Sequence, residues 1–146
     1  MGLLDDLGDG PVAVDTAPFI YLVEEHQRYL PAVDEFFEAV ARGDRRVVTS
    51  SLTLLELLVH PYRDGNIALA AKYEAFLTRG RGVRLAPLTR SVLRAAAYLR
   101  ATTRLKTPDA MQIATATTHG CPVFLTNDRR LPAIPGLRIV ALDSYC

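Results

Sequence analysis

The sequence predicts an α/β fold built on a central parallel sheet. Short apolar runs alternate along the chain with helical segments, the order expected when parallel strands are joined by helical crossovers. The run at residues 122–125 is apolar throughout, as in a strand that is buried on both faces. At 146 residues, the chain has the length of one domain with its own core.

The expected strands are short runs of apolar and β-branched residues bounded by turn residues. In chain order they are residues 12–14, 47–49, 83–85, 122–125 and 138–142. Asp15 ends the first strand, and Thr126, Asn127 and Asp128 end the fourth. Ligands of parallel sheets bind beyond the carboxyl ends of the strands, where the strand order reverses. Acidic side chains are therefore expected at a binding edge.

The expected helices have apolar residues at helical spacing. In chain order they are residues 19–24, 34–42, 52–60, 67–77, 91–103 and 108–118. Ser50 or Ser51 caps the third of these helices. Pro61 stops it, because proline has no N–H for the helical ladder and its ring clashes with the preceding turn.

The start of the last helix places an acid at a defined position. Thr107 is expected to cap this helix, and Pro108 suits the first helical position. Asp109 then lies in the first turn, where the helix dipole favours negative charge. The chain thus carries one acid at the start of this helix and another, Asp128, after the strand that follows it.

Composition excludes several classes of protein. No apolar run approaches the roughly 20 residues that span a bilayer. The first ten residues are acidic and lack a basic n-region, so residues 1–11 are expected to be a flexible extension before a single domain at residues 12–146. Cys121 and Cys146 have no metal-ligand spacing and form no disulfide framework. These features predict a cytoplasmic protein with no membrane association.

Charge is unevenly distributed along the chain, although the formal net charge is only +1. Residues 1–38 carry acids and a single base, Arg28, whereas residues 79–106 carry bases and no acid. The basic segment fits a flank that binds nucleic-acid phosphates beside an acidic pocket. It equally fits a solvated helix face that pairs with the acidic part or with a partner chain.

Four acids are candidates for a common site, although each also has an ordinary structural explanation. Asp15 and Asp128 fit turn or cap residues after strands, and Asp109 fits a helix-start acid. Glu56 is the only charged residue between Thr49 and Val59, on an otherwise apolar helix. Its side chain either faces solvent or lines a polar pocket.

Convergence of these acids would require a counter-charge. Two carboxylates about 5 Å apart repel by roughly 3 kcal/mol at an effective dielectric of about 20. Such a group is stable only if some acids are protonated or a divalent cation neutralises them. Oxygen ligands suit Mg²⁺ or Mn²⁺, and magnesium keeps waters that leave room for a phosphate and an attacking water. This is the arrangement of metal-assisted phosphodiester cleavage.

At these residues the chain resembles a known family, the PIN-domain nucleases, and within it the VapC-type toxins of prokaryotic toxin–antitoxin pairs. The resemblance covers residues 12 to about 142, in the segments AVDTAPFIYLVE, SSLTLLELLVHP, KTPDAMQIATA and FLTNDRRLPAIPGLRIVAL. The family's acidic motif maps in order onto Asp15, Glu56, Asp109 and Asp128. Leu131 stands where an aromatic residue is usual, and the segment before Asp15 is longer than usual.

The resemblance implies a three-layer α/β/α sandwich and Mg²⁺- or Mn²⁺-dependent endoribonuclease activity. It also implies a homodimer and, for a toxin, a VapB-like antitoxin protein as partner. Asp15, Asp109 and Asp128 are expected to bind the metal or its waters, and Glu56 to hold or deprotonate a water. The expected hydrogen-bond partners of these acids are Thr16, Thr126 and Asn127. The expected RNA-phosphate contacts are Arg94, Arg100, Arg104, Lys106, Arg129 and Arg130.

Two other functions remain open. The chain is alternatively a non-catalytic PIN-like module that binds RNA or protein without cleavage. A phosphatase with an aspartyl nucleophile is disfavoured, because the segment starting at Asp15 lacks the second acid two residues later that such enzymes use as acid and base.

Overall fold

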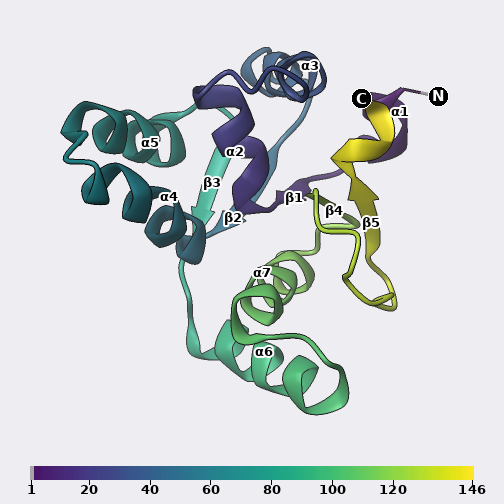
Figure 1. Cartoon of the computed structure of the whole chain (residues 1–146). Helices are drawn as coiled ribbons and strands as arrows, with labels where there is room; N and C mark the ends of the chain where they lie inside the picture. The colour runs from purple at the N-terminus through teal and green to yellow at the C-terminus, as the bar shows by residue number, and fades with distance from the viewer. Residues whose placement is uncertain (1) are drawn as a thin grey trace.

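A single sheet of five parallel strands runs through the molecule, in the order β3-β2-β1-β4-β5 (Figure 1). The structure is a computed structural model and describes residues 2–146. The strands are β1 (Val12–Val14), β2 (Val47–Ser50), β3 (Val83–Ala86), β4 (Val123–Thr126) and β5 (Arg138–Ala141). The predicted α/β fold with a central parallel sheet is confirmed.

Helices cover both faces of this sheet (Figure 1). One layer contains α2 (Thr16–Val23), α3 (Leu30–Ala41), α4 (Ser51–Arg63) and α5 (Ile67–Arg79). The other contains α6 (Arg90–Thr102) and α7 (Thr107–Thr118), which pack against each other. Two short helices, α1 (Leu3–Leu7) and the 3₁₀ helix η1 (Leu142–Tyr145), lie near the two chain ends.

Alternation along the strands divides the core into two parts. In β1, Val12 and Val14 pack into the core under α2 and α3, whereas Ala13 packs on the opposite face with α7. In β4, Phe124 likewise lies on the α7 face. The fully buried Ala110, Ile113, Ala114 and Ala116 line the same face of α7. Three of these four residues are alanines, and the helix packs directly against β1, β2 and β4.

The strand order reverses between β1 and β4. From β1 the chain proceeds to β2 and β3 on one side, and it returns to place β4 and β5 on the other side. In an open parallel sheet, a reversal of this kind leaves a crevice beyond the carboxyl ends of the two central strands. Asp15 follows β1 directly, and Asn127 and Asp128 follow β4.

The N-terminal segment differs from the expected flexible extension. Residues 3–7 form α1, and Leu3 and Leu7 are buried in the main core. The Tyr145 hydroxyl donates a hydrogen bond to the Asp6 carboxylate, so the helix is also tied to the other end of the chain. The prediction relied on the acidic composition and did not consider that Leu3 and Leu7 are four positions apart, which gives the segment one apolar face.

Two helix boundaries also differ from expectation. Pro61 does not stop α4, which continues to Arg63 with Pro61 buried inside it. The loss of one helical N–H is tolerated because the helix ends within the next turn and the ring packs against the interior. Thr107 is not the cap of α7: it is the first helical residue, and its hydroxyl accepts a hydrogen bond from Arg100 Nη1 at 2.9 Å.

None of the helices within residues 2–146 is both long enough and apolar enough to cross a bilayer.

Candidate active site

Asp15 joins the ends of the two central strands. Its backbone N–H donates to the carbonyl of Leu125 at 2.9 Å, which continues the pairing of β1 with β4. Its Oδ1 accepts the Thr16 N–H at 2.8 Å, as a cap of α2. Its Oδ2 accepts the Thr126 hydroxyl at 2.8 Å. The carboxylate is therefore held in one orientation by groups from α2 and β4.

Thr126 connects Asp15 to Asp128. The side chain is fully buried, and its hydroxyl oxygen accepts the backbone N–H of Asp128 at 3.0 Å while its hydrogen goes to Asp15. The Asp128 carboxylate accepts hydrogen bonds from the backbone N–H and the guanidinium of Arg130, at 2.9 and 3.0 Å. Thr126 thus occupies the position expected for a hydrogen-bond partner of the acids.

Glu56 points from α4 toward the start of α2. Its Oε1 accepts the Thr16 hydroxyl at 2.6 Å, so Thr16 contacts both Asp15, through its N–H, and Glu56, through its side chain. Of the two orientations that the sequence left open for Glu56, the structure has neither in full: the side chain is half-buried and accepts the bond from Thr16, and it lines neither of the clefts described below. Thr16, the residue after Asp15, therefore links the acid on α4 to the acid at the end of β1.

The carboxylates are close enough to affect one another's ionisation. Burial raises the pKa of Asp15, and the hydrogen bonds from Thr126 and Thr16 partly offset this rise. The charges of Glu56 and Asp128 raise the pKa further. Burial also raises the pKa of Asp109, and the charges of Asp15 and Asp128 raise it further. The hydrogen bonds from Arg130 lower the pKa of Asp128. The four sequence-predicted acids therefore lie in one electrostatic cluster.

This cluster has the donor chemistry of a hard divalent cation. All of its ligand atoms are carboxylate oxygens, and the neighbouring acids add to the rise that burial gives the pKa values of Asp15 and Asp109. Across residues 2–146, however, no three His, Cys, Asp or Glu side chains are arranged to hold an ion together. The Asp128 carboxylate instead pairs with the guanidinium of Arg130, at 3.0 Å.

Two clefts flank the acids and share Asp128 and Arg130 in their walls. The first, about 510 Å³, extends from Asp15 toward Tyr21 and Tyr29 on α2 and at the start of α3. The second, about 530 Å³, extends from Asp109 along the loop between α6 and α7. Asp15 lines the first cleft, Asp109 lines the second and Asp128 lines both, whereas Glu56 lines neither.

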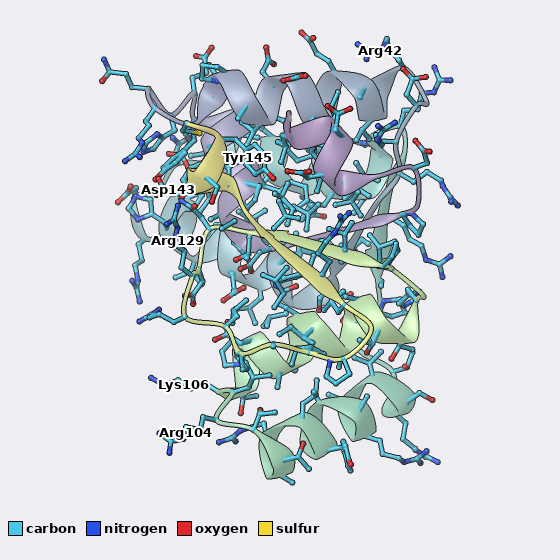
Figure 2. The ribbon with its side chains drawn as sticks, turned by 90° about the vertical axis from the view of Figure 1, so that its right-hand side faces the viewer. Arg42, Arg104, Lys106, Arg129, Asp143 and Tyr145 are labelled. Carbon is cyan, nitrogen blue, oxygen red and sulfur yellow. The ribbon has the colours of Figure 1, made fainter. Side chains whose placement is uncertain are left out.

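The basic residues expected to bind phosphates fall into two groups. Arg104 and Lys106 line the second cleft and Arg129 lines the first, on the same side of the molecule in Figure 2. Arg100 instead holds the loop between α6 and α7, through its contacts to the Leu105 carbonyl and to Thr107. Arg94 is exposed on α6 and lines neither cleft.

Comparison with known sequences identifies the family. The sequence model of the PIN domain matches residues 12–137, which is most of the chain. This chain belongs to the PIN-domain family. A search of curated protein sequences found no match.

Solved structures share the fold of this PIN domain. A DNA-bound VapBC complex from Salmonella typhimurium matches with a TM-score of 0.72 and 23% identity, over 91% of this chain and 98% of that one. VapBC2 from Rickettsia felis, bound to a promoter DNA fragment, matches with a TM-score of 0.71 and 16% identity, over 90% of this chain and 98% of that one. VapC20 from Mycobacterium tuberculosis is described as a toxin that cleaves the sarcin-ricin loop. It matches with a TM-score of 0.66 and 17% identity, over 82% of this chain and 91% of that one.

One acid of this PIN domain's first cleft was not identified from the sequence, and one predicted hydrogen-bond partner has other contacts than expected. Asp143 lines the first cleft, where it pairs with Arg28 at 2.8 Å and with Arg129 at 3.1 Å. Asn127 accepts the Asp143 N–H and donates to the Tyr21 hydroxyl, so it braces the cleft wall instead of contacting an acid of the cluster. No local sequence pattern indicated that Asp143 lines this cleft together with Tyr21 and Tyr29.

Proposed function

We propose that this PIN domain is a metal-dependent endoribonuclease that hydrolyses RNA phosphodiester bonds, and that it is the toxin of a type II toxin–antitoxin pair. One observation carries the proposal: four carboxylates from different elements are close enough for their charges to interact, and three of them, Asp15, Asp109 and Asp128, line two clefts that also carry bases in their walls. The proposal includes a VapB-like antitoxin as partner, a homodimer and a cytoplasmic location. The toxin–antitoxin structures that share the fold support the antitoxin partner.

The acids divide the chemistry among them. Asp15, Asp109 and Asp128 would hold Mg²⁺ or Mn²⁺, which when bound would polarise the phosphate and lower the pKa of a water. Thr126 keeps Oδ2 of Asp15 from rotating. Glu56 uses its Oε1 for Thr16, which leaves Oε2 to orient the attacking water and to take its proton.

The bases position the substrate. Arg104 and Lys106 on one side of the acids and Arg129 on the other would bind phosphates of one strand, which places a phosphodiester bond over the cluster. The attacking water forms the new P–O bond as the bond to the leaving ribose oxygen breaks, and that oxygen takes up a proton. RNA is the proposed substrate because VapC20 is described as cleaving the sarcin-ricin loop.

Cleavage of RNA by the purified protein tests this function. Wild-type protein with Mn²⁺ is expected to cut a labelled single-stranded RNA, and EDTA or the substitution Asp15→Asn is expected to abolish the cut. Asp44→Asn is the matched control, because Asp44 pairs with Arg42, at the far side of the molecule in Figure 2. Full activity of Asp15→Asn, or in EDTA, would exclude the metal mechanism.

A second function is favoured by the contact between Asp128 and Arg130, which leaves the acids without a ready-made ion site. In this case the PIN domain binds RNA or protein without cleavage. RNA binding that is unchanged by Mn²⁺ or EDTA, with no cleavage product, would support the non-catalytic module over the nuclease.

A further inference from the structure

A buried amide lies beneath the acid cluster. Gln112 on α7 is 3% exposed, and its Nε2 is 2.9 Å from the Thr53 hydroxyl on α4. The same nitrogen is 3.5 Å from Thr16 Oγ1 and 3.5 Å from Glu56 Oε1. A buried polar side chain is costly unless it is hydrogen-bonded, so an amide placed here needs these partners.

The direction of the hydrogen bonds around this amide follows from counting hydrogens. Thr49 Oγ1 donates its only hydrogen to the carbonyl of Val14 at 2.8 Å. In the 2.7 Å contact between Thr49 and Thr53, the donor is therefore Thr53. Thr53 has then used its hydrogen, so it can only accept from Gln112. The nitrogen of the amide, and not its oxygen, must face Thr53.

This orientation directs the second N–H of the amide toward Glu56. The Thr16 hydroxyl donates to the same carboxylate oxygen, Oε1, at 2.6 Å. Glu56 is thus approached by two donors on one oxygen, and the two contacts restrict the orientation of its carboxylate. Hydrogen bonds therefore run from the Val14 carbonyl, directly before Asp15, through two threonines and the Gln112 amide to Glu56. They fix the position of Glu56 relative to the end of β1.

We propose that Gln112 is a positioning residue for Glu56 in the cleavage reaction. Its role rests on the proposed nuclease function. Gln112 lies three residues after Asp109, and residues at this spacing share one face of a helix. Helix α7 therefore supplies one acid of the cluster directly and, one turn later, supports the orientation of another acid that comes from α4.

The kinetic test replaces Gln112 with leucine, which is close in size and has no hydrogen-bonding group. We expect kcat to fall about tenfold, the effect of one weak hydrogen bond to a charged group, with KM for RNA changed less than about twofold. Thr115→Val is the control: Thr115 is buried on the same helix, but its hydroxyl donates to the Met111 carbonyl and not to the cluster.

A double-mutant cycle separates positioning from general loss of packing. If Gln112 acts through Glu56, the change Gln112→Leu costs no further activity in a Glu56→Gln background. Additive losses would overturn the proposal, as would wild-type kcat in Gln112→Leu. Thr53→Val provides a second variant if Gln112→Leu does not fold, because it removes the acceptor that orients the amide, and we expect it to lower kcat in the same way.

A third measurement does not depend on activity. In metal-free protein, the side-chain amide protons of Gln112 are expected to exchange slowly with solvent by NMR, and their resonances are expected to move on Glu56→Gln or Thr53→Val. Fast exchange, or resonances that neither substitution moves, would contradict the contact. If wild-type protein does not cleave RNA, the proposed function fails, and this measurement alone decides whether Gln112 orients Glu56.

Discussion

Replacing Asp109 with asparagine is expected to stabilise the metal-free protein while it abolishes RNA cleavage. Burial raises the pKa of Asp109, and the charges of Asp15 and Asp128 raise it further. At neutral pH the ionised carboxylate therefore opposes folding. Asparagine has nearly the same shape and removes the charge. An increase in stability together with loss of activity is characteristic of a functional site and not of a structural one.

The size of this effect follows from the position of Asp109. Two unit charges 4 Å apart repel by about 1 kcal/mol in water and by about 4 kcal/mol at an effective dielectric of 20. Asp109 is half-buried at the mouth of a cleft, which favours the lower value. A gain of about 1 kcal/mol corresponds to a rise in Tm of roughly 2–4 °C for a domain of this size.

The pH dependence has a defined sign. The raised pKa values of Asp15 and Asp109 mean that the folded protein takes up protons at a higher pH than the unfolded chain. Their destabilising effect is present at neutral pH and disappears as the pH falls through the raised pKa values. The stability advantage of Asp109→Asn should therefore shrink over the same range. Asp128 acts oppositely: its pKa is lowered, so its contribution is lost only below its usual range.

Thermal and urea unfolding in EDTA, at several pH values, measure the effect. Mn²⁺ at a hundred times its dissociation constant should stabilise wild-type protein by about 2.7 kcal/mol and should have much less effect on Asp109→Asn. Asp44→Asn, in an exposed surface pair, should follow wild type in both experiments. An Asp109→Asn protein that is less stable than wild type in EDTA and keeps the full response to Mn²⁺ would contradict a role of Asp109 in metal binding.

Three further outcomes are expected. Thr126→Val should lower the free energy of unfolding by about 2 kcal/mol, because the Asp15 carboxylate loses a hydrogen-bond donor and the Asp128 N–H loses its acceptor. Unfolding in urea at the wild-type midpoint would contradict this. Arg104→Ala and Lys106→Ala should each weaken RNA binding and reduce its salt dependence by about one charge, whereas Arg94→Ala should not; equal effects of all three would contradict the cleft assignment. Leu7→Ala should lower the free energy of unfolding, measured by thermal unfolding, by about 2–4 kcal/mol, because Leu7 is buried in the core. Unchanged stability would instead indicate a flexible N-terminal segment.

Topology explains why the main features of the site could be predicted from the sequence. Because parallel strands present their carboxyl ends at one edge, an acid within two residues of the end of each central strand was enough to predict that Asp15 and Asp128 lie near each other. Asp109 followed from the start of a helix, a local signal. Glu56 was ambiguous alone, since one charged residue on an apolar helix fits either a solvent-facing or a pocket-facing side chain. The roles of these acids stay predictions until they are tested.

Other features depended on contacts that a single sequence does not encode. Gln112 sits in an ordinary helical pattern, and only its burial against Thr53 separates it from a surface glutamine. The turn of Asp128 toward Arg130 depends on side-chain geometry within three residues. Arg100 fits a phosphate-binding base by charge, yet its guanidinium is used by the Leu105 carbonyl, which only the loop conformation determines. Long-range contacts and side-chain geometry of this kind account for most of the differences between the predicted and the observed site residues.

The central claim is that acids from distant parts of the chain bind one hard divalent ion. Anomalous diffraction from a crystal grown with Mn²⁺ tests it most directly. We predict a peak about 2.0–2.2 Å from carboxylate oxygens of Asp15 and at least one of Asp109 and Asp128, with Asp128 released from Arg130. A crystal that contains Mn²⁺ at millimolar concentration and shows no peak among these oxygens would contradict the claim.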